Sequence, residues 1–554
     1  MAAFLLLGIV LQVLNPQIAR QFVDATRDSS NTTSLTFLAL LFIGAALVSS
    51  GFRALAAYVS NDVAWRATNA LRADLTAHTL GLGMGFHKSR PPGELIERID
   101  GDVNALSGFF SSFVISLGGN VLLLIGVLLA LTLQNWQLGV AFSLYAVLGG
   151  FCLALSARFS DAWKEERERV AQFYGFLGEA LTATEDIRGN GATAWVMRRM
   201  RLEMKALFRV RLSANMKASI VWGTSIMFWV IADALTYGFG SRLYREGALS
   251  IGAVYMLMHY AWMVAQPIEN FRHHLQELQR AEASIARVTE LLAIKSTLLD
   301  GSLALTSQTN GVSVSLEQVS FSYDDDTPVL NGVNLQLEAG SVLGLLGRTG
   351  SGKTTLARLL FRFYDPQGGV VRIAGQDIRR YNLAQYRSQI ALVTQDVQLF
   401  QASLRDNLTF FDASIADSRL LEALQKLGLQ DWLGKLAQGL DTPITADSLS
   451  SGEAQLVALA RAFLHNPKLI ILDEASARLD PATEQQLEQA LDTLLEQRTA
   501  IIIAHRLKTV ERASHILILQ HGSVLEFGAR QALAANPDSS FAELRRVGLE
   551  EVLA

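Results

Sequence analysis

Long apolar runs and short polar breaks alternate along the first half of the chain. Six of these runs approach the ~20 residues that a helix needs to cross the hydrocarbon core of a bilayer. They cover residues 1–24, 35–60, 108–133, 137–158, 218–241 and 250–273. The pattern therefore predicts an all-α membrane domain with six spanning helices.

The pattern changes from about residue 310, where short apolar runs alternate with amphipathic, charged stretches. Such alternation is typical of the strands and helices of a soluble α/β domain. We expect a transmembrane domain over residues 1–295, a linker over 296–312 and an α/β domain over 313–554.

The polar connections between the spans alternate in length and in basic charge. The first, third and fifth are short and together hold three Lys or Arg residues, whereas the second and fourth hold five and eleven. Because basic loops stay on the cytoplasmic side, we expect the long connections, both termini and the α/β domain in the cytoplasm. The sequence thus predicts a multi-pass protein of the cell (inner) membrane. The long connections have the pattern of helices that extend the spans, with turns near residues 86–100 and 183–195.

Composition removes several other classes of protein. The mean hydropathy is +0.25, which is unusual for a purely soluble protein. The net charge is -4 and the basic residues are spread along the chain, so no nucleic-acid partner is expected. The single cysteine, Cys152, can form neither an internal disulfide nor a cysteine metal cluster, and we interpret it as a small apolar residue.

Two features of the predicted spans allow more than one interpretation. Asp233 is the clearest acidic residue inside a span, where an unpaired charge costs several kcal/mol. It is either a functional group or a structural partner for a polar group on a neighbouring helix. The aromatic and Met-rich span 250–273 either lines a substrate cavity or reflects ordinary helix packing, with a kink expected at Pro267.

The segment GRTGSGKTT follows the strand-like SVLGLL and precedes the helical LARLLFRF. This is the G-x-x-x-x-G-K-T motif in the strand, loop and helix context that it requires. Its glycines let backbone N–H groups surround phosphates, and the helix N-terminus favours an anion. Lys353 is expected to reach the β- and γ-phosphates of ATP, and Thr354 to ligate Mg²⁺. The expected ATP-binding residues of this loop are Gly347, Arg348, Thr349, Gly350, Ser351, Gly352, Lys353, Thr354 and Thr355.

Two later strand ends supply further candidates for this site. The segment KLIILDE has the pattern of a buried parallel strand and ends in Asp473 and Glu474. An acid at this strand end holds Mg²⁺ in P-loop enzymes, and the next acid is placed to polarise a water for attack on the γ-phosphate. The strand-like TAIIIAH ends in His505, which is suited to contact the γ-phosphate as a donor.

Together these residues and the six spans resemble an exporter-type (type IV) ATP-binding cassette (ABC) half-transporter over essentially the full length of the chain. The resemblance implies that Tyr323 in VSFSYDD stacks on adenine and that Gln395 in LVTQDVQLF contacts Mg²⁺ and couples to the membrane domain. It implies that Glu474 is the catalytic glutamate and His505 the switch histidine, and that Asp480 closes the D-loop. The turns near 86–100 and 183–195 resemble the coupling helices of that family.

In that family two cassettes face each other head to tail, and each ATP lies between the P-loop of one chain and the signature of the other. LSSGE, Leu449 to Glu453, occupies the position of the signature, which usually reads LSGGQ. The residues expected to contact the partner-bound ATP are Ser450, Ser451, Gly452 and Glu453.

The signature region departs from the family pattern, whereas this chain's own P-loop, Asp473, Glu474 and His505 do not. The Cβ of Ser451 is expected to hold the backbone back from the phosphate, and the carboxylate of Glu453 opposes an anion at a helix N-terminus. The D-loop SARLD also carries Ala477 and Arg478. We therefore predict a heterodimer whose partner carries an ordinary LSGGQ and a replaced catalytic glutamate. The alternative is a homodimer with two slightly altered sites.

The resemblance implies an ATPase that exports amphipathic or hydrophobic molecules (drug, lipid or peptide) by alternating access, with ATP and Mg²⁺ as cofactors. The expected partners are the lipid bilayer, the transported molecule and a second half-transporter. An ATP-gated regulatory or channel-like protein is one alternative, which Glu474 and His505 disfavour. An importer built on the same fold is another alternative. The six spans exclude a soluble DNA-repair ATPase with a similar cassette.

Overall fold

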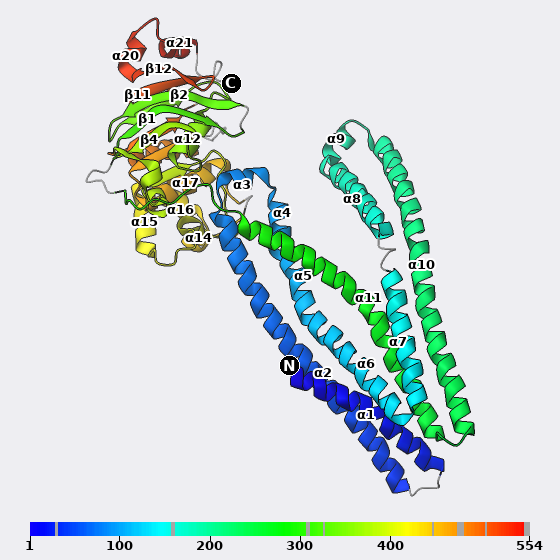
Figure 1. The fold of residues 1–554 in the computed structure, drawn as a ribbon. Helices are drawn as coiled ribbons and strands as arrows, with labels where there is room; N and C mark the ends of the chain where they lie inside the picture. The colour runs from blue at the N-terminus through cyan, green and yellow to red at the C-terminus, as the bar shows by residue number, and fades with distance from the viewer. Residues whose placement is uncertain are drawn as a thin grey trace. The chain divides into compact units, whose positions relative to one another are not determined.

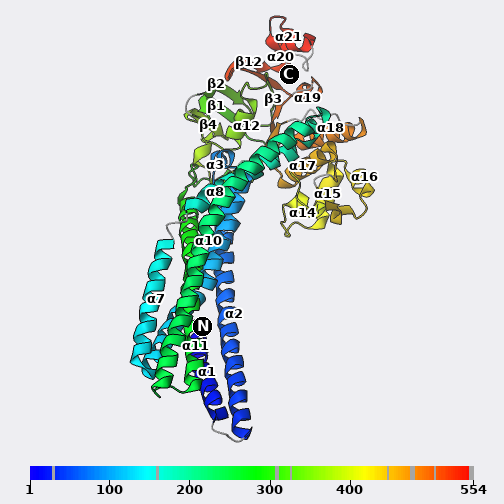
Figure 2. The same cartoon turned by 90° about the vertical axis from the view of Figure 1, so that its right-hand side faces the viewer.

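The computed structural model describes residues 1–27, 32–156, 161–305, 311–324, 327–445, 448–473, 481–504 and 507–547. The chain forms two compact units, which are drawn together in Figures 1 and 2. The first unit comprises Met1–Leu80 and Pro92–Ile294, and the second comprises Gly81–Pro91 and Lys295–Ala554. The short segment Gly81–Pro91 thus belongs to the second unit although helices of the first flank it in the sequence.

The first unit is helical in its described residues. Its helices are α1 (Ala2–Arg27), α2 (Thr32–Gly81), α4 (Pro92–Ile96), η1 (Glu97–Gly101), α5 (Asp102–Gly108), η2 (Phe109–Phe113), α6 (Val114–Gln134), α7 (Trp136–Ser156), α8 (Asp161–Thr182), α9 (Thr184–Gly189), α10 (Thr193–Arg245) and α11 (Ile251–Ala293). The six predicted spans coincide with α1, α2, the run from α5 to α6, α7, α10 and α11. A short π-helical turn, η2, interrupts the third of them, and another, η1, precedes α5.

Among the described residues, three helical runs are long and apolar enough to cross a membrane: Ala2–Arg27, Thr32–Gly81 and Pro92–Gln134. The apolar helix Trp136–Phe151 is shorter. Helices α2 and α10 have 50 and 53 residues. At 1.5 Å per residue each is about 75–80 Å long, more than twice the ~30 Å hydrocarbon core. Each of these two helices therefore joins a predicted span to part of a long polar connection, as the sequence predicts.

The core of the first unit lies among α1, α6, α7, α10 and α11. Helix α11 packs against the other four, so it lies at the centre of their packing. At the other end of α11, Arg287 Nε donates to Asp102 Oδ2 of α5 at 2.9 Å and Ser284 Oγ donates to Asp102 Oδ1 at 2.9 Å. The carboxylate of Asp102 is buried, and its partners on α11 satisfy it.

The second unit contains a six-stranded sheet of order β12-β11-β3-β10-β9-β6, a four-stranded sheet of order β2-β1-β4-β5 and the pair β7-β8. The strands are β1 (Val314–Ser322), β2 (Pro328–Leu337), β3 (Val342–Leu346), β4 (Gly368–Ile373), β5 (Gln376–Asp377), β6 (Ile390–Val393), β7 (Ala402–Ser403), β8 (Pro443–Ile444), β9 (Leu469–Asp473), β10 (Thr499–Ile503), β11 (His515–Gln520) and β12 (Ser523–Ala529). In the larger sheet every pair is parallel except β11–β12, and the four-stranded sheet is antiparallel.

The second unit also contains helices, some of which lie beside the larger sheet (Figure 1). They are α3 (Met84–Ser89), α12 (Lys353–Leu360), η4 (Ile378–Arg380), α13 (Leu383–Arg387), α14 (Leu404–Thr409), α15 (Asp417–Lys426), α16 (Gln430–Lys435), η5 (Gly439–Asp441), α17 (Ser451–His465), α18 (Pro481–Leu495), α19 (Leu507–Glu511), α20 (Arg530–Ala535) and α21 (Ser540–Val547). All five residues of β10 and the first four of β9 are buried, which is why both strands read as continuous apolar runs. The predicted α/β fold of this half is confirmed.

The parallel strands bring the predicted site together at one edge of the larger sheet. Ile503 of β10 pairs with Leu345 of β3 on one side and with Asp473 of β9 on the other. Leu472 of β9 pairs in turn with Val393 of β6. The carboxyl ends of these strands therefore lie in register, and ligands of open α/β sheets bind at that edge.

Candidate functional site

The loop between β3 and α12 depends on glycine at positions where any side chain would collide. Gly347 has φ +148°, and a Cβ there would lie 2.3 Å from the carbonyl oxygen of Leu519. Gly352 has φ +104°, and a Cβ would lie 2.6 Å from Leu330 Cδ2. The loop is thus folded tightly against the neighbouring strands, with its end at the N-terminus of α12. This is the geometry in which backbone N–H groups receive phosphate.

Lys353, the first residue of α12, folds back over this loop. Its side chain is buried, and Nζ donates to the carbonyl oxygens of Gly347 at 2.6 Å and Arg348 at 3.1 Å. Burial lowers the pKa of Lys353, and the charge of Asp473 opposes that effect. The Oγ atom of Ser351 is also buried, and within the described part of the chain it has no hydrogen-bond partner. A cation that donates to backbone carbonyls and a buried hydroxyl are both well suited to a phosphate group.

Two of the predicted magnesium ligands meet at the sheet edge. Thr354 Oγ1 donates to Asp473 Oδ2 at 3.4 Å, although 119 residues separate them in the sequence. Two oxygen ligands of one Mg²⁺, each 2.0–2.1 Å from the ion in octahedral geometry, lie about 3 Å apart. Gln395 follows β6 at the same edge and is exposed. The oxygen atoms of Thr354, Asp473 and Gln395 are therefore of the kind that ligates Mg²⁺.

Tyr323, the predicted adenine-stacking residue, lies against the P-loop helix. Its hydroxyl is 3.2 Å from Thr355 Oγ1 and accepts a hydrogen bond from Arg358 at 3.1 Å. Tyr364 packs edge-on against its ring at 5.3 Å between centroids. Lys88 Nζ of α3 lies 4.0 Å from the centre of the same ring. The resemblance implies a coupling helix near Lys88, but the sequence gives no signal for its aromatic partner, which is 235 residues further along the chain.

Three of the predicted catalytic and nucleotide-contacting residues lie outside the described residues. They are Glu474, Asp480 and His505, and Ala477 and Arg478 of the D-loop also lie outside them. Strand β9 ends at Asp473, just before Glu474, and strand β10 ends at Ile503, two residues before His505.

The signature residues form a capping box at the N-terminus of α17. Ser450 is the N-cap, and Glu453 N donates to its hydroxyl oxygen at 3.3 Å. In return Glu453 Oε2 accepts from the Ser450 backbone N–H at 2.8 Å and from the Ser450 hydroxyl at 2.9 Å. Trp432 of α16 donates its indole N–H to Glu453 Oε1 at 3.1 Å. The Ser450 hydroxyl, which the resemblance assigns to the partner-bound ATP, is therefore engaged by a carboxylate of its own helix.

Comparison with known proteins identifies the family of this chain. Residues 1–268 match the ABC transporter transmembrane region, and residues 330–477 match the ABC transporter family. An uncharacterized ABC transporter ATP-binding protein of Bacillus subtilis, YknV, is 30% identical over 550 residues, which cover 96% of this chain and 88% of that protein. The chain belongs to the ABC transporter family.

Other relatives of this ABC transporter carry functional names. An ATP-dependent lipid A-core flippase of Syntrophus aciditrophicus is 29% identical over 91% of this chain and 84% of that protein. A multidrug resistance ABC transporter ATP-binding and permease protein of Lactococcus lactis is 25% identical over 96% of this chain and 90% of that protein. The structure of a bacterial Atm1-family ABC exporter with ATP bound matches with a TM-score of 0.79 and 25% identity, over 99% of this chain and 97% of that one.

These matches confirm the main predictions from the sequence. The ABC transporter is of the exporter type, with a helical transmembrane domain fused to an ATP-hydrolysing cassette in one chain. Its P-loop, Tyr323 and Asp473 meet around α12. The contacts of Lys88 with Tyr323 and of Trp432 with Glu453 carry no signal in a single sequence, because each joins segments that only the fold brings together.

Proposed function

We propose that this ABC exporter uses ATP to move an amphipathic or hydrophobic molecule, such as a lipid or a drug, across the membrane by alternating access. The names of the flippase and multidrug relatives support a substrate of this kind. The cassette, the long connections and both termini would be cytoplasmic, as the basic charge of the second and fourth connections indicates. Closure of paired cassettes around ATP would favour one membrane conformation, and loss of the γ-phosphate the other.

The residues of this chain divide the work of hydrolysis among them. The loop Gly347–Thr355 cradles the phosphates, and Lys353 exchanges its carbonyl partners for phosphate oxygens. Thr354, Asp473 and Gln395 would hold Mg²⁺, which would neutralise charge on the β- and γ-phosphates. Glu474 orients and polarises the attacking water, and His505 donates to the γ-phosphate. Tyr323 stacks on adenine, and Asp480 closes the D-loop.

The observation that carries this proposal is the meeting of Lys353, Thr354 and Asp473 at the sheet edge. The test is Glu474→Gln in the full-length protein, reconstituted in nanodiscs with every partner that co-purifies. Loss of a general base lowers turnover by about 10²–10⁴-fold, whereas MgATP binding should persist. Unchanged ATP turnover would contradict the role of Glu474, and unchanged substrate movement without turnover would favour an ATP-gated channel.

We also propose that the chain functions as a heterodimer with one hydrolytic and one degenerate site. The self-capped signature supports this, because Glu453 engages the Ser450 hydroxyl and places negative charge where the partner's ATP would bind. The site that this chain completes for its partner would then be impaired, while the site on its own P-loop and Glu474 would hydrolyse ATP. The partner should carry an ordinary LSGGQ and lack the catalytic glutamate.

Affinity purification of this chain from its native membrane tests the pairing. A second half-transporter should co-purify in equal amount, and mass spectrometry should identify it by its own P-loop. A stable homodimer with full ATPase activity would refute the heterodimer and leave the exporter assignment intact.

A further inference from the structure

The segment that follows α11 is fastened to the cassette by a short ladder of backbone hydrogen bonds. Gly301 N donates to Tyr381 O at 3.1 Å and Leu303 N donates to Arg380 O at 3.0 Å. In the other direction, Asn382 N donates to Leu303 O at 2.8 Å. Leu303 and Tyr381 form a parallel β-bridge. Residues 299–303, which we call the coupling strand, therefore lie along residues 380–382 as an added strand would.

Two further features reinforce this ladder: the side-chain hydrogen bonds of Asp300 and the close backbone approach at Gly301. Asp300 accepts hydrogen bonds from Leu383 N at 2.6 Å and from Asn382 Nδ2 at 3.0 Å, at the start of α13. A Cβ on Gly301 would lie 2.2 Å from the carbonyl carbon and oxygen of Arg380. Because backbone atoms on the cassette side occupy that space, the strand approaches too closely for any side chain at this position.

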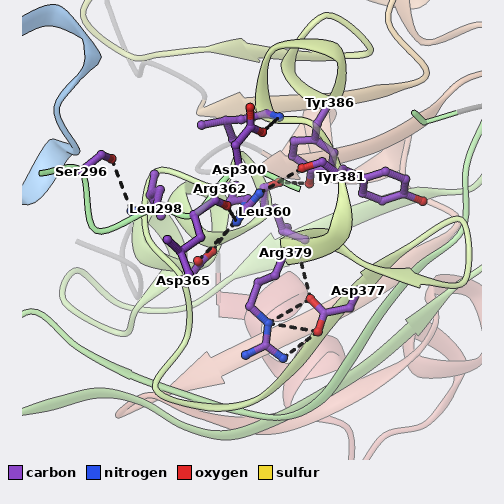
Figure 3. Close-up of polar contacts among 12 residues, drawn as sticks. Ser296, Leu298, Asp300, Leu360, Arg362, Asp365, Asp377, Arg379, Tyr381 and Tyr386 are labelled. Carbon is purple, nitrogen blue, oxygen red and sulfur yellow. Dashed lines mark hydrogen bonds and ion pairs between the residues drawn. The ribbon is translucent and has the colours of Figure 1, made fainter. Parts of the chain in front are cut away.

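Arg362 connects the coupling strand to the end of the P-loop helix (Figure 3). It lies two residues beyond α12, has a positive φ of 55° and is 0% exposed. Its guanidinium donates to Leu299 O at 2.6 Å, to Tyr381 O at 3.3 Å and to Asp365 Oδ1 at 3.0 Å. A buried cation with this many partners is costly to release, because each broken contact leaves a desolvated polar group unpaired.

The residues that contact the coupling strand are connected to the nucleotide site by two routes. The hydroxyl of Tyr386 in α13 donates to Leu360 O, the last residue of α12, at 2.5 Å. Helix α12 begins at Lys353 of the P-loop. In the other direction, α13 leads within three residues to β6 and then to Gln395. Any displacement of α12 or β6 therefore moves the partners of the coupling strand.

We propose that the coupling strand transmits the nucleotide state of the cassette to α11 of the same chain, with Arg362 as its positioning residue. Helix α11 ends at Ala293, six residues before Leu299. Residues 294–298 join α11 to a strand that backbone hydrogen bonds and a buried guanidinium fix to the cassette. Because this connection is short, a displacement of residues 299–303 would act on the end of α11. This inference rests on the proposed nucleotide site.

Amide hydrogen exchange of the full-length protein in nanodiscs tests it, using MgATP with orthovanadate as the probe. In the wild type the probe should slow exchange at residues 347–356 and change exchange at residues 281–293 of α11. Coupling free energies of 1–3 kcal/mol correspond to changes of about fivefold or more. Gly301→Ala should keep the response of 347–356 and lose that of 281–293. Gly434→Ala, where a Cβ meets nothing within 4 Å, is the matched control and should behave as the wild type.

A response of residues 281–293 in Gly301→Ala equal to that of the wild type would overturn the proposal. Asp300→Asn, which keeps the backbone path and weakens only the α13 contact, serves where Gly301→Ala fails to fold and should reduce the α11 response in part. An unchanged α11 response in Asp300→Asn would then overturn the inference. Absence of protection at 347–356 in the wild type would instead refute the nucleotide site itself.

Discussion

Glutamate and the glutamine usual at the last signature position differ by one terminal group, and that group decides which hydrogen bonds the signature can form. A glutamine amide both donates and accepts, whereas a carboxylate only accepts. The two oxygens of Glu453 accept from the Ser450 backbone, the Ser450 hydroxyl and the Trp432 indole. A negative side chain at the first turn of α17 also favours the helix macrodipole. Glu453 would thus compete with an incoming phosphate for the Ser450 backbone N–H and hydroxyl.

Restoring the family residue with Glu453→Gln should therefore strengthen nucleotide binding at the site that this signature completes. Removing one charged competitor for a hydrogen-bond donor is worth about 1 kcal/mol, or roughly fivefold in affinity. Trp432→Phe removes the second anchor of the carboxylate and should have a smaller effect in the same direction. Equilibrium MgATP binding to the complex measures both. Trp195→Phe, which changes an exposed tryptophan of α10, is the control, and unchanged or weaker binding in Glu453→Gln would contradict the self-capping account.

Two P-loop glycines allow the cost of backbone strain to be measured separately from the cost of a steric collision. Gly347 and Gly350 both have positive φ, but only at Gly347 would a Cβ meet neighbouring atoms. Gly350→Ala should cost the ~1–3 kcal/mol of an unfavourable backbone conformation. Gly347→Ala should add a collision with the Leu519 carbonyl and abolish MgATP binding. Thermal unfolding with and without MgATP measures the difference, and equal behaviour of the two variants would show that close approach is not what requires Gly347.

At this scale the sequence predicts the contiguous motifs and misses the contacts between distant segments. The P-loop residues lie next to one another, so their pattern is visible. Arg362, by contrast, follows an ordinary amphipathic helix, and its partner Leu299 lies 63 residues earlier in a stretch with no periodic pattern. Nothing in a single sequence indicates that such an arginine is buried.

Among the elements, the helices and strands with strong hydrophobic patterns were predictable, whereas the pairing of residues 299–303 inside the predicted linker was not. Helices α2 and α10 continue from apolar spans into charged segments with helical periodicity, and β9 and β10 are uninterrupted apolar runs. The coupling strand has neither pattern because its contacts are made by the backbone, Asp300 and Gly301. The π-turns η1 and η2 arise from backbone hydrogen bonding and also carry no compositional signal.

In the short helix α3, Lys88 makes a contact with the ring of Tyr323. Lys88 lies over the ring of Tyr323, and an exposed cation–π contact contributes about 0.5–1 kcal/mol. Lys88→Ala should therefore speed amide exchange at residues 84–90 by about two- to fivefold. Tyr323→Phe keeps the aromatic face and should preserve slow exchange, whereas Tyr323→Leu should not. Lys435→Ala on the exposed surface of α16 is the control, and equal exchange in Lys88→Ala and the wild type would exclude this anchor.

For the whole molecule, two of the departures from the family pattern, Ser451 and Glu453, lie in the segment that the resemblance assigns to the partner's ATP. Lys353, Thr354 and Asp473 have the residue types and positions expected of a working site. Ser450, Glu453 and Trp432 engage one another at the signature. A heterodimer of this chain with the proposed second half-transporter would therefore hydrolyse ATP at one site and retain it at the other. The identity of the partner and of the transported molecule has no counterpart in these motifs, because neither is encoded by the cassette.

Vanadate trapping of nucleotide in the purified complex tests this asymmetry most directly. With MgATP and orthovanadate, a single nucleotide should be trapped per pair of chains, since only a hydrolytic site forms the trapped state. A photoreactive ATP analogue should attach it to the P-loop of this chain, and Glu474→Gln should abolish trapping. Equal trapping on both chains, or trapping on the partner alone, would contradict the account.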